Sequence, residues 1–410
     1  MSTVPIPEDL GRLGVAAEGS FKASPGTVKD VDGLMSLTVD AGRALLERGI
    51  MRNSQKDQYA PRVGNQTYKM SCEVLLSSET APDCGDWIKT SMGEEVAVDA
   101  LTFSSANSTT VTKSAGTFDD ILRLTVGGSA VHRPVKSLSG SVATYAILPG
   151  GSATAVKNAA STSTPVGRAF RDDPDGAVTT YEVQNDQGGS GYAGEIPVKA
   201  QGCVPMPFKL MWTLDGLLKL AFSWDGAIWT PLAAGGSGLA NGTDQTAYYL
   251  SDACSFGLQD LATPAALTEI GLKSLEITYG YEFMANRASQ AISGGAIPGS
   301  NITGWVRHNS HAERVKCVIN DADWETWDDA VEAGTKYQLW AEFYPGTPGA
   351  TADGGRVCTW LPQVKVVSAK PVKQNGLVCT ALEIAIERDN TIPETTKPGR
   401  RSYLSFFGST

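Results

Sequence analysis

The segment from Gly189 to Gly194 comes nearest to a motif with known chemistry. Its sequence, GSGYAG, matches the GxGxxG pattern of dinucleotide-binding loops. That pattern works only when a helix follows, because the helix N-terminus receives the pyrophosphate. Here Glu195, Ile196 and Pro197 follow, and no strand–helix–strand unit surrounds the segment. We therefore expect a flexible loop rather than a dinucleotide site.

An acidic segment partly matches a calcium-binding loop. Asp173, Asp175, Gly176 and Glu182 fall at the spacing of such a loop. The cation Arg171 occupies the first ligand position, however, and the residues after the segment are typical of a strand instead of the helix that a calcium loop needs. The pattern predicts a solvated turn, with an adventitious cation site as the alternative.

Histidine and cysteine residues are too scattered to predict a catalytic or metal site. The three histidines are His132, His308 and His311, and no cysteine or carboxylate cluster lies at ligand spacing from them. No GxSxG nucleophile motif occurs. Cys84, near an expected helix start, is a candidate reactive thiol, but it has no histidine near it in the sequence. We therefore expect no catalytic residue, no metal and no cofactor, and a protein that is not an enzyme.

Composition and charge exclude several classes of function. The chain of 410 residues has a net charge of −10, whereas duplex-binding proteins carry basic surfaces that contact phosphates. No apolar run approaches the roughly 20 residues of a membrane-spanning helix, and residues 1–10 lack the features of a secretory signal. The seven cysteines are odd in number and have no CxxC spacing, which favours a reducing compartment over a disulfide framework.

The elements expected around these residues are mostly strands. Apolar and polar residues alternate in residues 67–76, 206–214, 218–224 and 275–283, and Asp215-Gly216 marks a hairpin turn between the middle two. Further strand candidates are 96–103, 121–126, 179–183, 305–307, 314–319, 337–344, 356–367 and 377–388. The pattern predicts a mainly β fold, an antiparallel β-sandwich or open barrel with a flanking helix.

Helical signals are few. Residues 81–92 predict a short helix that buries Trp87 and Ile88, and a second helix is expected between a cap at Asp321 and Gly334. Residues 37–50 also hold mostly helix formers.

The chain is expected to divide into a core and several peripheral segments. Residues 1–35, interrupted by prolines and glycines, are interpreted as an extended arm. Residues 36–103 and 203–390 form the β core, 104–202 an insertion or outer lobe rich in Ser, Thr, Gly and Ala, and 391–410 a C-terminal tail.

Two expected strands combine an apolar stripe with acidic residues on the reverse face. Glu276 and Glu282 lie behind the apolar residues of 272–283, and Glu383 and Glu387 behind those of 379–388. The reverse positions of these two strands hold no Lys or Arg. Ordinary solvated strands and the acidic lining of a passage are both compatible with this pattern.

Three parts of the chain resemble the tail tube (major tail) proteins of long-tailed bacteriophages. Residues 13–20 (LGVAAEGS) and 25–27 (PGT) are similar to the opening arm of such proteins, and residues 297–304 to the loop before a core strand. The order strand, loop, strand, Trp-rich helix and three strands over residues 272–388 is similar to their core. The resemblance leaves out residues 104–202.

The resemblance implies a β-sandwich that assembles into hexameric rings, which stack into a hollow tube. In some relatives two fused copies of the fold form a trimeric ring instead. The implied partners are further copies of the chain, the tape measure, terminator and distal tail proteins, and phage DNA that passes without sequence-specific binding. The implied location is the virion, after assembly in the host cytoplasm and without membrane contact.

The resemblance also implies site residues. A negative lumen would repel phosphates, so four glutamates are expected to line the channel: Glu276, Glu282, Glu383 and Glu387. Apolar anchors in the arm and in the long loop are expected to contact a neighbouring ring; they are Val15, Phe21, Ile292, Ile297 and Ile302.

Other functions remain open at this point. A carbohydrate-binding β-sandwich could use Trp212, Trp224 and Trp229 as a sugar platform, although Trp212 and Trp224 fall on apolar stripes typical of a core. Another phage tail or adhesion protein is also compatible with the sequence. An all-β hydrolase is disfavoured because no paired acid and base residues are found.

Overall fold

The protein is mainly β, with two short helices. The computed structural model describes residues 11–31, 33–46, 62–76, 84–96, 102–106, 110–115, 121–126, 129–145, 167–187, 198–214, 216–231, 254–262, 268–287, 302–308, 313–343, 356–387 and 402–407. Nineteen strands form one continuous antiparallel sheet, and the described strands do not close into a barrel. Two smaller sheets, of five and two strands, share no backbone ladder with it among the described residues.

The N-terminal part of the chain builds two ladders and a helix, which we call the N-terminal repeat. Its elements are β1 (Gly11–Ala17), β2 (Lys29–Asp30), β3 (Leu34–Leu46), β4 (Arg62–Leu75), α1 (Gly85–Met92), β12 (Tyr181–Gln187), β13 (Val198–Pro205), β14 (Phe208–Thr213), β15 (Lys219–Gly226) and β16 (Ile228–Pro231). One ladder has the order β2-β1-β12-β13-β16. The other has the order β3-β4-β15-β14.

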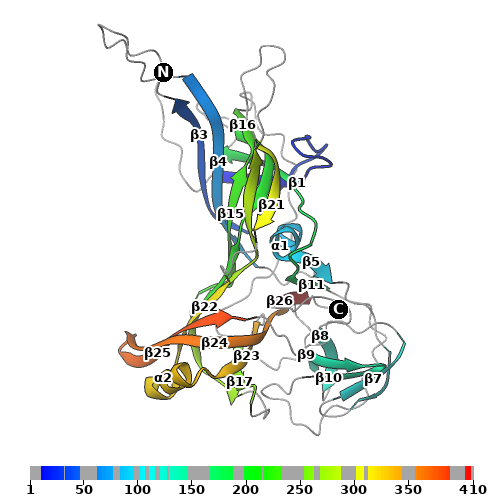
Figure 1. Cartoon of the computed structure of the whole chain (residues 1–410), viewed down its shortest axis with the longest axis vertical. Coiled ribbons are helices and arrows are strands. Elements are labelled where there is room, and N and C mark those ends of the chain that lie inside the picture. Colours follow the sequence, from blue (N-terminus) through cyan, green and yellow to red (C-terminus); the bar gives the residue numbers. More distant parts are fainter. Residues whose placement is uncertain are drawn as a thin grey trace.

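The C-terminal part repeats this plan, and we call it the C-terminal repeat. Its elements are β17 (Cys254–Asp260), β18 (Thr268–Glu269), β19 (Leu272–Tyr279), β20 (Glu282–Arg287), β21 (Ile302–His308), β22 (Arg314–Ile319), α2 (Trp324–Ala333), β23 (Lys336–Phe343), β24 (Arg356–Gln374), β25 (Leu377–Ile386) and β26 (Tyr403–Phe407). One ladder is β18-β17-β23-β24-β26 and the other is β19-β22-β25-β24. The long strand β24 belongs to both ladders, so its two parts are equivalent to β13 and β14 of the N-terminal repeat. Figure 1 shows β3, β4 and β15 at one end of the molecule and β24, β25 and α2 at the other.

The two repeats agree in register as well as in order. All seven residues of β1 pair with β12, and all seven of β17 pair with β23. The ladders also break at matching places, after Leu34 and Tyr181 in the N-terminal repeat and after Leu272 and Tyr337 in the C-terminal one. Because bulges are specific local features of a ladder, this agreement indicates an internal duplication.

A short stretch of sequence records the same duplication. Residues 34–42 (LMSLTVDAG) and 272–280 (LKSLEITYG) share Leu, Ser, Leu and Gly at matching positions. Cys72 and Cys317 also match, because each pairs with the equivalent residue of its ladder, Leu37 and Leu275. The equivalence of the two repeats can therefore be stated residue by residue.

The repeats are joined edge to edge through β14 and β19. These two strands pair over six residues, from Phe208 opposite Tyr279 to Thr213 opposite Ser274. The result is a run of eight strands in the order β3-β4-β15-β14-β19-β22-β25-β24, which we call the eight-stranded tract.

An excursion of the chain lies between α1 and β12. It contains β5 (Gly93–Val96), β6 (Thr102–Ala106), β7 (Thr110–Ala115), β8 (Ile121–Val126), β9 (Ser129–Ser139), β10 (Val142–Tyr145) and β11 (Gly167–Asp172). Its two ends touch, since a Cβ on Gly176 would lie 2.0 Å from the carbonyl oxygen of Gly93. β11 pairs with β5 and with β26, so the excursion extends the sheet of the C-terminal repeat. Strands β6 to β10 form the separate five-stranded sheet.

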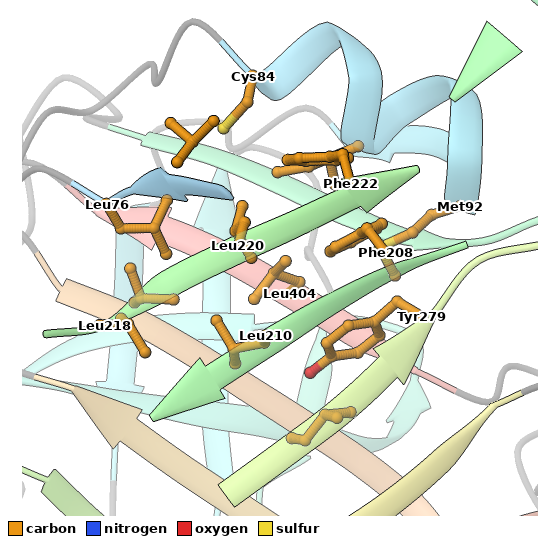
Figure 2. Close-up of a cluster of buried hydrophobic side chains, with 14 of the residues drawn as sticks. Leu76, Cys84, Met92, Phe208, Leu210, Leu218, Leu220, Phe222, Tyr279 and Leu404 are labelled. Carbon is orange, nitrogen blue, oxygen red and sulfur yellow. The ribbon is translucent and has the colours of Figure 1, made fainter. Parts of the chain in front are cut away.

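The core lies on one face of the eight-stranded tract. Phe208, Phe222 and Tyr279 stack with ring centroids 5.2–5.3 Å apart across β15, β14 and β19. Figure 2 shows them on the same side of the three strands, with Leu210 and Leu220 beside them. All five side chains are buried. Burial of such large apolar groups is the main term that stabilises the fold.

Several expected elements are confirmed. The hairpin across residues 206–224 appears as β14 and β15, β4 falls where alternation predicted a strand, and β8 coincides with the strand candidate 121–126. Helix α1 buries Trp87 and Ile88 as expected. Helix α2 ends at Gly334, which has the left-handed conformation, but its cap is Asp323 rather than Asp321. Asp321 instead accepts hydrogen bonds from the Trp327 indole and the Asp323 backbone.

Two expectations about secondary structure are wrong. Residues 37–46 belong to strand β3, because pairing with β4 outweighs the helix propensity of their Ala and Leu residues. The predicted strand 275–283 is two strands in different sheets, separated at Gly280, whose φ of +92° suits glycine.

The expected division of the chain also differs from the strand pairing. Residues 11–17 of the expected arm form β1 inside the sheet, where Leu13 is fully buried. Strands β12 and β13, expected within the insertion 104–202, belong to the N-terminal repeat. The strand expected at residues 179–183 overlaps β12, but sequence alternation does not show that its partners are β1 and β13.

Candidate assembly interface

The internal junction shows what joins two repeats. Phe208, Leu210 and Trp212 of β14 are at most 3% exposed and face the core beside the buried residues of β19. On the opposite face, Lys209 forms an ion pair with Glu276 at 3.0 Å. The junction therefore combines a backbone ladder, a shared apolar core and a cross-strand charge pair.

Each end of the eight-stranded tract has an edge with no strand beside it in the described residues. β3 pairs only with β4, and β24 beyond Lys365 pairs only with β25. Such edges carry unpaired N–H and C=O groups that can pair with another chain. The β24 edge is the equivalent of β14, and the β3 edge is the equivalent of β19.

Large apolar side chains are exposed close to these two edges. Met35 on β3 is 56% exposed, and Leu377 and Val378 at the tip of the β24–β25 hairpin are 53% and 49% exposed. Val367, at the bulge of β24, is 41% exposed. Met284 and Val306, which face each other in the hairpin of β20 and β21, are exposed to a similar degree, so exposed apolar residues occur at these two edges but not there alone.

Helix α2, which lies next to β24, leaves the edge of β24 accessible to a partner strand. Helix α2 packs against β24 through the half-buried Trp327 and Val331 and the buried Ala330. Helix α1 has the matching position beside β13. Since β19 pairs with β14 in the presence of α1, α2 in the same place leaves the β24 edge accessible.

The face of the tract opposite the core is hollowed. A depression of about 600 Å³ lies over β14, β19, β22, β25 and β24. Glu276 and Glu383, two of the four expected channel residues, line it together with Lys219, Lys316 and Lys370. Lys316 stands directly between the two glutamates in the ladder. The reverse positions of β19 and β25 suggested an acidic face. The face is not acidic, because the adjacent strands β15, β22 and β24 contribute lysines to it.

The other two expected channel residues lie elsewhere. Glu282 belongs to β20, in the separate two-stranded sheet. Glu387 follows the end of β25, where its carboxylate accepts a hydrogen bond from the Gln363 amide at 2.7 Å. The structure thus brings Glu276 and Glu383 together and separates them from Glu282 and Glu387.

Only some of the residues expected to contact a neighbouring ring lie in the described part of the chain. Val15 packs against the core from β1, and Phe21 lies against Gly202. Ile302 is 5% exposed in β21. Ile292 and Ile297 lie outside the described residues.

A hairpin of the C-terminal repeat is anchored on the N-terminal repeat. Strands β20 and β21 form it, and Arg307 of β21 donates hydrogen bonds to the carbonyl oxygens of Thr90, Asp173, Pro174 and Gly176 at 2.6–3.3 Å. Its guanidinium also lies over the Tyr281 and Phe283 rings. Burial lowers the pKa of Arg307, with Tyr281 and nearby aspartates opposing that shift.

A charged cluster fixes the excursion to α1. The Arg168 guanidinium donates to both carboxylate oxygens of Glu95, at 2.6 and 2.9 Å, and to Asp86 of α1 at 2.7 Å. The hydrogen bond from Arg168 lowers the pKa of Glu95, although partial burial opposes the shift. No pattern of the sequence places Arg168, Glu95 and Asp86 together.

The residues considered for catalysis or metal binding form no site among the described ones. Arg171 pairs with Glu94, Asp173 accepts from the backbone of Asp175, and Cys84 is buried. No group of three or more His, Cys, Asp or Glu in the described part of the chain could hold a metal ion. Residues 189–194, His311 and the His132 side chain lie outside the description.

Thiol chemistry is also disfavoured at two equivalent positions. The Cys72 and Cys317 side chains are buried in the core, and burial raises the pKa of each to about 12. A thiol with such a pKa is protonated at neutral pH and is a poor nucleophile.

The tryptophans considered for a sugar platform do not form one. Trp212 and Trp224 are buried in the core, as expected from their stripes. Trp229 is half-buried, and its indole donates to the Gly42 carbonyl oxygen at 3.0 Å.

No protein-family model matches the chain, and a search of curated proteins finds no match. Among the described residues, neither helix has the length and apolar character of a membrane span.

Proposed function

We propose that the protein is a subunit of a bacteriophage tail tube, which assembles into rings that stack into a hollow tube. The observation that carries this proposal is the eight-stranded tract. Its two halves are equivalent and joined edge to edge, and within the described part of the chain one β14-like edge and one β19-like edge have no partner strand. A chain that ends in two complementary edges can repeat the same junction with the next chain.

Such a contact is head-to-tail and therefore builds a ring or a helix. A heterologous contact closes into a ring when the rotation per subunit divides a full turn. A closed ring of strands also removes the free edges that would otherwise cause aggregation. Each repeat would then be one tail tube β-sandwich with its flanking helix, whereas the sequence was expected to form a single such core from residues 36–103 and 203–390.

The duplication favours three chains in each ring. The resemblance implied six copies of the fold, either as a hexamer or as a trimer of fused copies. Because each chain here carries two equivalent repeats, three chains supply six. This replaces the hexamer that we expected from the sequence with a trimer.

The hollowed face of the tract would then line the lumen. Glu276 and Glu383 lie there among Lys219, Lys316 and Lys370, so the lining would hold one more lysine than glutamate in each chain. Because both glutamates face Lys316 across the ladder, part of this positive charge would be neutralised and fewer lysines would be available for the phosphate contacts that give strong DNA affinity. DNA could pass without being held, which is the behaviour that an acidic lining was expected to provide.

Other parts of the proposal follow from the resemblance alone. They are location in the virion after assembly in the host cytoplasm, contact with tape measure, terminator and distal tail proteins, and absence of catalysis and cofactors. The five-stranded sheet of the excursion would form an outer lobe.

Electron microscopy and mass measurement test the proposal. We expect negative-stain images of concentrated full-length protein to show rings with a uniform central hole, and tubes made of them. The ring should have three times the chain mass of 43.2 kDa. A particle of six chains would contradict the ring size but not the function. A protein that stays monomeric up to millimolar concentration would contradict the function.

A further inference from the structure

We propose that the free edge of β24 pairs with β3 of a second copy of this chain in one defined register, in which Lys370 stands opposite Asp40. The proposal rests on the proposed function, and it adds the register and the residues of the contact. Its partner is a second copy because the same chain already contains a finished example of the junction, β14 with β19.

The register follows from the equivalence of the repeats. Lys209 of β14 and Lys370 of β24 match, since each pairs with an alanine of the next strand, Ala221 and Ala381. The difference in residue number between equivalent residues is the same all along β14 and β24.

The partner strand matches in the same way. Thr278 of β19 and Asp40 of β3 are equivalent, because they pair with Arg314 and Lys69 at matching points of β22 and β4. Lys209 stands opposite Thr278 in the internal junction. The same relation between two chains places Lys370 opposite Asp40.

Charge supports this register. Lys370 and Asp40 are both exposed, and they have opposite signs at the positions that the equivalence brings together. Opposite charges that face each other across antiparallel strands stabilise the pairing. Asp40 would then lie between Lys69 of its own chain and Lys370 of the next.

Exposed apolar side chains support it as well. Leu214 and Lys273 are hydrogen-bonded at the end of the internal junction, and their equivalents are Asn375 and Met35. The register therefore brings the exposed Met35 to the hairpin tip that carries the exposed Leu377 and Val378. Because successive side chains of a strand point to opposite faces, one of these two tip residues would join Met35 in an apolar contact that the single chain leaves exposed.

Disulfide cross-linking tests the register. Met211 and Glu276 face each other in the internal junction, and their equivalents are Val372 and Thr38. This pair is of the non-hydrogen-bonded kind, with Cα atoms about 4.5 Å apart, which suits a disulfide. We expect Thr38→Cys with Val372→Cys to give disulfide-linked dimers and trimers under mild oxidation, seen by gel electrophoresis without reductant. Thermal unfolding of the reduced variant should match that of the wild type.

The matched control moves one cysteine by two residues. Ser36→Cys with Val372→Cys places the thiols in diagonal positions about 7–8 Å apart, and we expect at least tenfold less cross-linked product. Wild-type protein under the same oxidation shows the background from its seven native cysteines. More product from the displaced pair than from the first would overturn the register, while rings in the microscope would still support the function. Monomers for every variant, with no rings, would overturn both.

Charge exchange is the second test. Asp40→Lys and Lys370→Asp should each raise the protein concentration needed for half-maximal assembly by about 2- to 5-fold per contact. The double exchange should return it to the wild-type value. Glu332→Lys, on the exposed side of α2, makes the same change of charge away from both edges and should have no effect. A double exchange that stays as impaired as the single ones would contradict the pairing of these two residues.

Discussion

At the scale of single residues, Arg307 joins its own hairpin to α1 and to the segment after β11. It reaches the carbonyl oxygens at the end of α1 and in the segment after β11, although it belongs to a hairpin of the other repeat. No carboxylate pairs with it in these contacts, so its charge is held by backbone dipoles and by two aromatic rings. Its role is therefore to fix the two repeats relative to each other.

Replacement of Arg307 should destabilise this joint. We expect Arg307→Met to lower the free energy of unfolding by about 2–4 kcal/mol, because four carbonyl groups lose a charged donor in a partly buried place. Urea unfolding followed by tryptophan fluorescence measures the change. Arg314→Met, at an exposed position of β22, is the control and should stay within about 0.5 kcal/mol of wild type. An equal loss in both variants would contradict the assigned role.

Glu95 should make stability depend on pH. Arg168 lowers the pKa of Glu95 below its ordinary value of 4.5. A carboxylate with a lowered pKa contributes stability above its unfolded pKa, and that contribution is lost as the pH falls through the folded value. We expect Glu95→Gln to melt below wild type at pH 7, and the difference in melting temperature to shrink as the pH falls below 4.5. Calorimetry at a series of pH values measures the difference, and a gap that does not shrink towards acid would exclude this cause.

At the scale of elements, β14 and β24 are equivalent strands in different surroundings. The second edge of β14 pairs with β19 of the same chain, whereas β24 has no such partner among the described residues. Leu210 in β14 is fully buried, whereas its equivalent in β24, Pro371, is exposed. The turn at Asn375 and Gly376 makes Gln374 and Leu377 a hydrogen-bonded pair, so the N–H that Pro371 lacks would point away from β25. Proline in this position is typical of a protected edge.

Removal of this protection should promote assembly. We expect Pro371→Leu to lower the concentration at which rings form by roughly tenfold, since one hydrogen bond and one apolar side chain join the contact. Light scattering against concentration measures the onset. Val306→Leu changes an exposed residue of β21, away from the β3 and β24 edges, and serves as the control. An unchanged onset for Pro371→Leu would mean that β24 does not form the contact.

The success of sequence-based prediction differed among elements for physical reasons. The hairpin of β14 and β15 was predictable because its core faces hold Leu210, Trp212, Leu220 and Phe222 at every second position. Strand β3 was not, because its side chains also suit a helix and only pairing with β4 decides between the two. The split at Gly280 depends on a contact with Ser91, which is far away in the sequence.

At the scale of the whole molecule, the duplication is present in the sequence, but the alternation of apolar and polar residues does not reveal it. The stretch 34–42 repeats in 272–280, yet the excursion after α1 enlarges only the N-terminal repeat and hides the common plan. Of the candidate site, Glu276 and Glu383 were found from strand alternation. The free edges were not found, because an edge is defined by the absence of a neighbour and the sequence does not show which strands are neighbours.

The excursion should be separable from the rest of the molecule. β5 and β11 are adjacent antiparallel strands with Val96 opposite Ala169, so a short turn can replace the chain between them. We expect a variant with residues 98–166 replaced by a turn containing Asn-Gly to keep its melting temperature within about 5 °C and to assemble as before. Calorimetry and electron microscopy check both. A variant that folds but no longer assembles would assign an assembly role to the outer lobe.

Strands β14 and β19 belong to the same chain, and this determines how the proposed ring would respond to dilution. Within one chain the two strands meet at an effective concentration that no dilution changes. In the proposed ring, the contacts between β24 and β3 of different chains would depend on the concentration of protein. A ring of three chains would therefore have three points at which it can open and three at which it cannot, and we expect dilution to release whole chains in the same fold that they had in the ring.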